Sequence, residues 1–332
     1  MNLEKVLIAL VPVFLSVSVL AAEQEQEEKE EKWDVSAPPG TPRTIPIDTR
    51  VGTWMSLDVS PNGRTIAFDL LGDIYLLPID GGQATVIESG LAWSMQPRFS
   101  PDGSEIAYTS DAGGGDNIWI MGADGNDPRQ LTKEDFRLLN NPYWSPDGAY
   151  VAARKHFTTR RSLGTGEIWI YHRNGGSGVA VIEKPGEEHQ KELGEPAFSP
   201  DGRYIYFSVD STSGSTFVYA QDSNDQIFEI RRHDMQTGKT ASFVTGAGGA
   251  VRPTPSPDGR YLAFVRRIRA KSALFLKDLV SGAEKPVYES LDQDLQEVWG
   301  CKGCIRTWTG RLIRRASCSG PMARSNESRS RA

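Results

Sequence analysis

The stretch Pro97-Arg98-Phe99-Ser100-Pro101-Asp102-Gly103 ends in a tetrapeptide, Ser-Pro-(Asp/Asn)-Gly, that decides the fold of this chain. Proline presets φ at about −65° in the second turn position, Asp or Asn tolerates the third, and Gly accepts a positive φ at the fourth. Such a type I turn followed by a left-handed residue joins two antiparallel strands. The tetrapeptide occurs five times, starting at Ser60, Ser100, Ser145, Ser199 and Ser256, with spacings of 40, 45, 54 and 57 residues.

Each repeat carries further strand patterns in a constant order. An apolar or aromatic residue precedes the turn in four repeats, and Pro255 is the exception. The strands expected after the turn are 65–68, 105–108, 150–153, 204–207 and 261–264, and the aromatic-centred strands that follow are 73–76, 117–120, 167–170, 226–229 and 273–276. A Gly-bearing turn then leads to a short last strand such as 129–132. Four strands per repeat predict an all-β protein, a β-propeller of four-stranded blades.

The repeat that runs from Pro97 through Asp116-Asn117-Ile118-Trp119-Ile120 to Arg129-Gln130-Leu131-Thr132 resembles a TolB-type (PD40, WD40-like) propeller repeat. The segments 52–61, 136–142 and 153–157 are similar to the N-terminal propeller of large exported amidohydrolases. The resemblance covers residues 45–299. It implies that a metal-dependent hydrolase barrel follows the propeller in the parent protein. We therefore expect no cofactor in this chain, because a divalent metal would belong to the missing hydrolase domain.

The ends of the chain predict export and a linker. Residues 1–22 have the features of a signal peptide: Lys5, the apolar run Val6 to Leu20, and small residues at Ala21-Ala22. The alternative is a membrane anchor, for which the apolar run is short. Residues 23–43 form an acidic and Pro-rich linker, so the propeller domain is expected over 44–299. We expect a location in the periplasm or outside the cell, with no integral membrane span after signal cleavage.

Residues 300–332 differ from the rest of the chain in charge and cysteine content. They hold Lys302 and seven arginines against Glu327, a net charge of +7, whereas the whole chain carries −6. All three cysteines, Cys301, Cys304 and Cys318, lie there. A lone Cys-x-x-Cys with no second pair does not make a zinc site. We therefore interpret 300–332 as an aberrant basic tail that is disordered.

The tail also permits a genetic test. If synonymous codons are chosen freely from Gly300 onward, a neighbouring frame can encode VQGVYPNMDWTPDSSSVVFWANGKI. That segment contains the next expected turn and strand pattern. We therefore hypothesise a frameshift near residue 300, which leaves the ring incomplete after five recognisable blades and predicts a marginally soluble product. The genomic sequence across codons 295–332 decides this.

The chain lacks the usual signatures of a hydrolase. Its four histidines, His156, His172, His189 and His233, form no His-x-His or His-Glu-x-x-His motif, and no Gly-x-Ser-x-Gly occurs. The acidic third positions of the repeated turns are explained by turn formation, and we expect successive turns to lie far apart around the ring. We therefore assign no catalytic, cofactor-binding or metal-binding residue, and expect this chain alone not to be an enzyme.

Two basic groups follow the second strand of their repeats and could form a patch for an anionic partner. Solvated loops, or salt bridges to a neighbouring domain, are the alternatives. The insertion 211–226 also carries Phe217, Val218 and Tyr219, which could pack on a partner domain or form an extended hairpin. The patch residues are Arg154, Lys155, His156, Arg160, Arg161, Arg266, Arg267 and Arg269.

Three functional hypotheses follow. The first is an exported docking module that resembles the N-terminal domain of an amidohydrolase without its catalytic metal barrel. The second is a free-standing TolB-like periplasmic scaffold, which the absence of a domain ahead of the propeller disfavours. The third is the propeller of a prolyl-oligopeptidase-like peptidase. In each case we expect a protein or peptide partner, or a missing C-terminal catalytic domain, and no nucleic acid.

Overall fold

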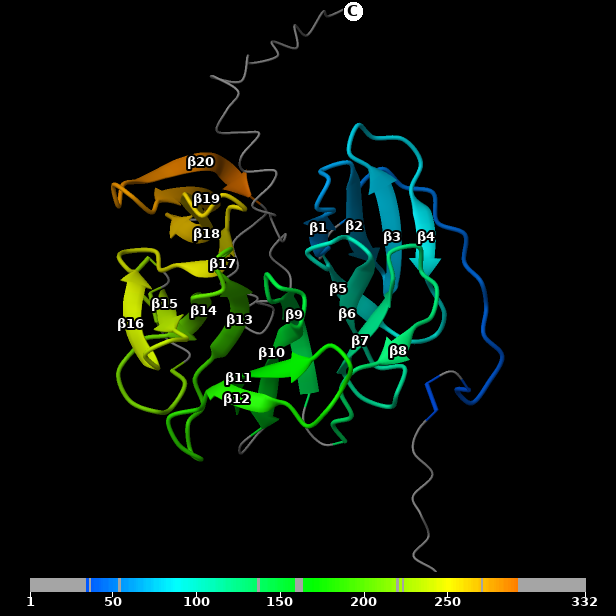
Figure 1. Cartoon of the computed structure of the whole chain (residues 1–332), viewed down its shortest axis with the longest axis horizontal. Coiled ribbons are helices and arrows are strands. Elements are labelled where there is room, and N and C mark those ends of the chain that lie inside the picture. The colour runs from blue at the N-terminus through cyan, green and yellow to red at the C-terminus, as the bar shows by residue number, and fades with distance from the viewer. Residues whose placement is uncertain are drawn as a thin grey trace, which may run out of the picture. The chain divides into compact units, whose positions relative to one another are not determined.

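The computed structural model describes residues 34–291 except 36, 53, 54, 136, 137, 159–163, 219, 220, 223 and 270. These residues form five four-stranded antiparallel sheets, each a meander of consecutive strands (Figure 1). The described part of the chain is an all-β propeller, as the repeat predicts. The strands are β1 (Leu57–Val59), β2 (Thr65–Leu70), β3 (Asp73–Pro78), β4 (Thr85–Glu88), β5 (Ser94–Phe99), β6 (Glu105–Ser110), β7 (Asn117–Gly122), β8 (Arg129–Gln130), β9 (Leu138–Trp144), β10 (Tyr150–Thr158), β11 (Gly164–His172), β12 (Val179–Ile182), β13 (Leu193–Phe198), β14 (Tyr204–Asp210), β15 (Phe228–Asp234), β16 (Lys239–Val244), β17 (Val251–Pro255), β18 (Tyr261–Ile268), β19 (Lys271–Asp278) and β20 (Glu284–Leu291).

The repeated turn has the predicted geometry in all five blades. Each turn glycine has a φ between 68° and 76°, and its amide donates to the carbonyl of the turn serine. The serine does more than the sequence indicates. In the second blade, Ser100 Oγ donates to Asp102 Oδ1 at 2.6 Å and accepts from the Glu105 amide at 2.9 Å. The hydroxyl therefore connects the turn to the start of the next strand.

The third strand of the fourth blade differs from the expected range 226–229. It begins at Phe228, and its fully buried isoleucine is Ile230. The isoleucines Ile74, Ile118 and Ile168 are likewise fully buried in the third strand of the first three blades. The sequence contains two candidate isoleucines, and Ile227 was the wrong choice because the preceding loop extends to that residue.

Hydrophobic clusters join each blade to the next. Tyr108 and Met121 of the second blade pack with Ile74 of the first, and Tyr171 of the third packs with Ile118 of the second. Two more clusters join the third blade to the fourth and the fourth to the fifth. A further cluster, around Leu274, contains residues of the fifth blade alone. Most of the described core therefore lies between sheets, as propeller blades require.

The strand order gives each blade two ends. The β1–β2 type of turn, which carries the tetrapeptide, and the β3–β4 type lie at one end, which we call the turn end. The β2–β3 type of connection and the link to the next blade lie at the other, which we call the loop end. The predicted signal peptide (1–22), most of the linker (23–43) and the tail (300–332) lie outside the described residues. Within the described part, no helix is long or apolar enough to cross a membrane.

Candidate functional site

Successive turns touch one another at the turn end. A Cβ placed on Gly103 would lie 3.1 Å from Cδ of Pro61, the proline of the preceding turn. Gly148 faces Pro101 in the same way, at 3.8 Å. The expectation that successive turns lie far apart is therefore wrong for these blades. Pro61 and Pro101 thus each lie close to the glycine of the following turn, which has no side chain.

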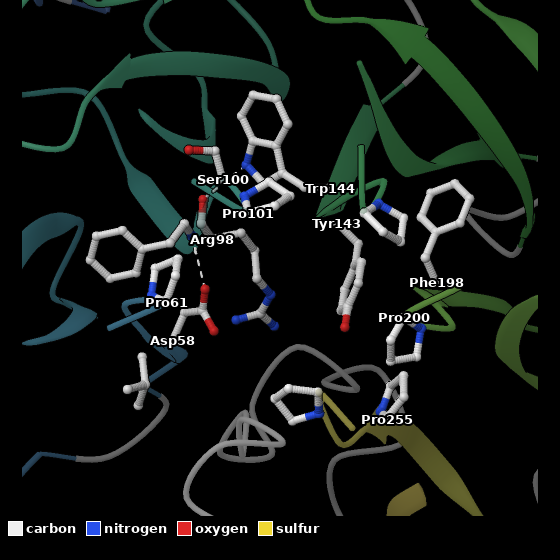
Figure 2. A pocket seen from close by; sticks show the side chains of 14 residues that line it. Asp58, Pro61, Arg98, Ser100, Pro101, Tyr143, Trp144, Phe198, Pro200 and Pro255 are labelled. Carbon is white, nitrogen blue, oxygen red and sulfur yellow. Dashed lines mark hydrogen bonds between the residues drawn. The ribbon is translucent and has the colours of Figure 1, made fainter. Parts of the chain in front are cut away.

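The turn prolines enclose a cavity of about 250 Å³. Every described blade contributes at least its turn proline, and aromatic residues from β5, β9 and β13 form the wall (Figure 2). The motif that sets the fold thus also builds a concave apolar surface. The lining residues are Asp58, Val59, Pro61, Arg98, Phe99, Ser100, Pro101, Tyr143, Trp144, Pro146, Phe198, Pro200, Pro255 and Pro257.

Arg98 is the cation of this cavity. Figure 2 shows its guanidinium pointing into the hollow between Asp58 and Tyr143. Nη1 donates to the carbonyl of Leu57 at 2.9 Å, which fixes the side chain against the first blade. Burial lowers the pKa of Arg98, and the charge of Asp58 opposes this change. A guanidinium stays charged in proteins, so the cavity presents a fixed positive charge within an apolar wall.

A layer of bulge residues lies four positions before the turn serines of the second to fifth blades. Gln96, Asn141, Glu195 and Arg252 all have left-handed backbones, with φ between 54° and 62°. Such values are uncommon outside glycine and usually persist where the surroundings fix them. The inner strands shift register next to these residues, which identifies β-bulges. Three of the four, Gln96, Glu195 and Arg252, are buried.

The bulges turn backbone amides toward the preceding blade. The Gln96 amide donates to Asp69 Oδ2 at 2.6 Å, and the Asn141 amide donates to Gln96 Oε1 at 2.8 Å. The Arg252 amide donates to Glu195 Oε2 at 3.0 Å. Each of these hydrogen bonds joins two consecutive blades. The bulge layer therefore acts as a fastening between sheets below the cavity.

Burial affects the charged groups in the bulge layer and Asp69, which accepts a hydrogen bond from it. Burial raises the pKa of Asp69, although the amides of Gln96 and Ser56 and the charges of Arg98 and Arg252 act in the opposite direction. Arg252 Nε lies 3.1 Å from Glu195 Oε1, and both side chains are buried. An arginine and a carboxylate taken out of water together stabilise each other while their geometry holds.

The first predicted basic group lies on β10 and is already ion-paired. Arg154 Nη2 lies 2.6 Å from Glu192 Oε1, and Arg154 Nε donates to the carbonyl of Leu193 on the next blade. His156 Nδ1 is 2.7 Å from the same guanidinium. Lys155 Nζ lies 2.6 Å from Glu134 Oε1. Arg154 therefore joins the third blade to the fourth, while Arg160 and Arg161 lie outside the described residues.

The second predicted basic group lies on the fifth blade. Arg266 Nη1 lies 2.7 Å from Glu284 Oε2, and its Nη2 donates to the carbonyl of Thr245. Arg267 is half-buried, and Arg269 is exposed in the β18–β19 turn with a φ of 55°. The fourth blade lies between the two groups in the strand order. Glutamates thus neutralise Arg154, Lys155 and Arg266 locally, and binding of an anionic partner by these groups stays a prediction.

The remaining site predictions fall on the loops. In the insertion between β14 and β15, Phe217 is half-buried and Val218 is exposed, while Tyr219 lies outside the described residues. Among the described residues, no group of three or more His, Cys, Asp or Glu is placed to hold a metal ion. The cavity and the bulge layer were not predicted from the sequence, although the constant four-residue spacing from bulge to turn serine is a detectable signal.

The five blades define a β-propeller with a cavity at its turn end. Residues 43–168 match the model of the PD40 family, described as TolB beta propeller domain. Residues 43–168 thus match a TolB-type β-propeller, as the repeat indicated. Among solved structures, putative TolB from Agrobacterium tumefaciens is similar with a TM-score of 0.57 and 22% identity, covering 73% of this chain and 83% of that one. TolB from Acinetobacter baumannii has a TM-score of 0.53 and 17% identity, covering 72% and 53%. These similarities show the fold.

Relatives of known sequence include a peptidase. The chain is 31% identical over 152 residues to "Uncharacterized peptidase YuxL" of Bacillus subtilis (strain 168), covering 36% of this chain and 22% of the relative. It is 27% identical over 239 residues to "Uncharacterized protein Atu1656" of Agrobacterium fabrum (strain C58 / ATCC 33970), covering 68% and 75%. The match therefore spans about a fifth of the length of the peptidase.

Proposed function

We propose that this chain is an exported docking module that binds a polypeptide segment at the cavity enclosed by its turn prolines. The observation that carries the proposal is the composition of that cavity. Its wall is mainly proline and aromatic, and the guanidinium of Arg98 points into it beside the carboxylate of Asp58. Ligand sites in proteins are usually concave and mostly apolar, with a few placed polar groups. This one is built by all five described blades, so its shape is fixed by the scaffold.

The chemistry of the cavity defines the kind of segment that fits. Pro61, Pro101 and Pro146 offer rigid apolar rings, and Trp144 and Phe198 offer aromatic faces to an extended chain. Arg98 offers a guanidinium that can hold a carboxylate through two hydrogen bonds. We therefore propose that the segment carries apolar side chains and a carboxylate, either of an acidic residue or of its C-terminus.

A pair of matched peptides tests this proposal. The probe is an extended six-residue peptide of Pro, Phe and Leu that ends in a free carboxylate, and the control is the same peptide with an amidated C-terminus. We expect the free acid to bind at least about tenfold more tightly to the full chain, and Arg98→Gln to abolish the difference between the two peptides. Equal binding of acid and amide to the unaltered protein would contradict the role of Arg98. Failure of both peptides to bind would contradict the cavity as a docking site.

The proposed parent protein is an exported amidohydrolase whose N-terminal propeller this chain resembles, and the missing metal barrel would carry the reaction. The similarity to the peptidase YuxL favours a second candidate, the propeller of a prolyl-oligopeptidase-like peptidase. The gene downstream of codon 299 separates them: a His-x-His motif supports the first, and a Gly-x-Ser-x-Gly motif supports the second. A stop codon in every frame would contradict both and support the free-standing periplasmic scaffold.

We further propose that the chain by itself catalyses no hydrolysis. The purified chain would be assayed with generic amide and ester substrates, with and without a chelator. Turnover that the chelator abolishes would contradict the proposal.

A further inference from the structure

An unusual residue occupies the β2–β3 turn at the loop end of the first blade. Leu71 and Gly72 have φ values of 56° and 90°, both in the left-handed region. Two-residue hairpins of this kind favour Asn-Gly, because a bulky side chain at positive φ is strained. Leu71 is also 60% exposed, so burial does not compensate the strain. Residues that break local rules in this way concentrate at functional positions.

Two further exposed apolar side chains lie beside this turn. Trp93 packs over Gly72, because a Cβ on that glycine would lie 3.0 Å from Trp93 Cε3. Trp93 is nevertheless 52% exposed, and Leu91, two residues before it, is 48% exposed. The Trp93 amide donates to Asp111 Oδ1 at 2.7 Å, which fixes the backbone of this segment. We call Leu71, Leu91 and Trp93 the Trp93 patch.

Carboxylates surround the Trp93 patch. Asp73 follows Gly72, Glu88 pairs with Ile74 on the neighbouring strand, and Asp111 accepts from the Trp93 amide. Burial raises the pKa of Glu88, and the charge of Asp73 adds to the effect. Burial also raises the pKa of Asp116, with a contribution from Asp111. Repulsion within each pair, Glu88 with Asp73 and Asp116 with Asp111, shows that the two carboxylates of the pair lie close together.

These carboxylates differ from those on the third blade. Among the described residues, none of Asp73, Glu88, Asp111 and Asp116 forms an ion pair with a Lys, Arg or His side chain. By contrast, Glu134 and Glu192, near the loop end of the third blade, are paired with Lys155 and Arg154. The loop end of the first and second blades therefore presents an apolar patch with an uncompensated acidic rim.

We propose that the Trp93 patch docks a cationic segment of a partner protein in which Lys or Arg alternates with apolar residues. The apolar side chains would cover Trp93, Leu71 and Leu91, and the cations would lie against the acidic rim. Tryptophan is enriched at the centres of protein interfaces, and complementary charge selects the partner. The acidic rim repels nucleic acids and anionic lipids. This surface is separate from the cavity, which lies at the turn end.

Calorimetric titration of the full chain tests the proposal with three ten-residue peptides. The first alternates Lys and Leu, the second Lys and Ser, and the third Glu and Leu. We expect the Lys–Leu peptide to bind saturably and at least about tenfold more tightly than either control, with an affinity that falls as salt is raised. Equal binding of the Lys–Ser peptide would show attraction by charge alone and would overturn the proposal. Absence of saturable Lys–Leu binding would overturn it as well.

Two substitutions locate the binding, and two more serve as controls. Trp93→Ala and Leu71→Asn are each expected to weaken Lys–Leu binding about tenfold or more. Leu71→Asn suits the turn geometry, so it removes the apolar side chain without harming the fold. Val280→Ala and Val179→Ala, at exposed apolar residues of the β19–β20 turn and of β12, are expected to leave binding unchanged. Unchanged binding by Leu71→Asn and Trp93→Ala would overturn the assignment of the peptide to this patch.

If the apparent affinity of the Lys–Leu peptide rose with salt, the chain's own basic residues 300–332 would be competing for the patch, and the assignment to a partner would be wrong.

Discussion

Gly103 lies against the ring of Pro61, with 3.1 Å between the position of a Cβ on the glycine and Cδ of the proline. The glycine of one turn therefore makes room for the proline of the turn before it. Both residues were expected from turn chemistry alone. Their contact shows that the repeated tetrapeptide also contributes to the packing between blades.

Replacing Gly103 by alanine tests this contact. Gly103→Ala should lower the free energy of unfolding by about 1–3 kcal/mol, because the left-handed backbone is strained and the new methyl group meets Pro61. Gly63→Ala and Gly259→Ala suffer the same backbone strain, but nothing lies within 4 Å of a Cβ at either position. Each of these two substitutions should lower the free energy of unfolding by about 1 kcal/mol. Urea unfolding of the three variants measures the difference, and equal losses would contradict a packing role for the turn contact.

The hydroxyl of the turn serine should stabilise the fold. Ser145 Oγ donates to Asp147 Oδ1 and accepts from the Tyr150 amide at 2.9 Å. Ser145→Ala removes both hydrogen bonds and should lower the free energy of unfolding by about 1–3 kcal/mol. Ser145→Thr keeps the hydroxyl and serves as the control. A loss by the alanine variant no larger than that of the threonine variant would contradict the proposed role of the hydroxyl.

The turn carboxylates should make stability depend on acid. Hydrogen bonds from Ser100 and from the Ser104 amide lower the pKa of Asp102 from 3.8 to about 2. A carboxyl whose folded pKa is depressed stabilises the fold above its unfolded pKa, and that contribution disappears as the pH falls from about 4 to about 2. Asp102→Asn keeps a hydrogen-bond acceptor but not the charge, so it should lower the free energy of unfolding at pH 7, and its difference from the unaltered chain should shrink on acidification.

The first blade supplies the matched control for that prediction. Asn62 already occupies the equivalent turn position, and Ser60 Oγ donates to Asn62 Oδ1 at 2.8 Å. Asn62→Asp should make the free energy of unfolding fall more steeply on acidification, whereas Asp102→Asn should make it fall less steeply. Urea unfolding at pH 7, 4 and 3 measures both, and parallel pH profiles for all three proteins would contradict the prediction.

Arg154 should be a structural residue of the junction between the third and fourth blades. Its side chain is 10% exposed and its partner Glu192 is 31% exposed. Arg154→Ala leaves the Leu193 carbonyl and Glu192 without their donor and should cost about 2–4 kcal/mol. Arg203→Ala breaks a pair whose arginine is 44% exposed, and should cost clearly less than Arg154→Ala. Thermal unfolding compares them, and similar losses would show that Arg154 is not needed at this junction.

The strain at Leu71 should be measurable as well. Leu71→Asn places the preferred residue of this turn at φ 56° and should raise the free energy of unfolding by about 1 kcal/mol. Leu71→Ala also removes the exposed apolar side chain, but alanine keeps a Cβ and has no side chain that can hydrogen-bond to the turn. Its free energy of unfolding should therefore rise less than that of Leu71→Asn. Denaturant unfolding distinguishes the two, and a loss of stability by the asparagine variant would contradict the presence of strain.

The sequence predicts those parts of the fold that depend on local chemistry. The turns and the strands after them follow from Pro, Asp and Gly at fixed positions and from the alternation that begins at Thr65 or Tyr204. The third strand of the fourth blade was wrong because a long loop precedes it and two isoleucines, Ile227 and Ile230, fit the pattern. Only burial in the folded blade distinguishes them.

The site was harder to predict because its parts come from separate blades. The bulge residues Gln96, Asn141, Glu195 and Arg252 differ in type, so only their constant four-residue distance from the turn serine marks them. The partner of Arg154 lies 38 residues away in the sequence, and that of Arg266 lies 18 residues away. Basic groups that seem free in the sequence therefore have acidic partners that only the packed sheets bring close.

The bulge fastenings have a direction along the chain. In all three hydrogen bonds between blades, the acceptor belongs to the earlier blade and the amide to the later one, as with Asp69 and Gln96. The first blade to leave the ribosome thus already displays the acceptor that the second requires. We expect the blades to dock in the order of their synthesis, each completed sheet serving as the template for the next. Domains with mainly neighbouring contacts can fold progressively in this way.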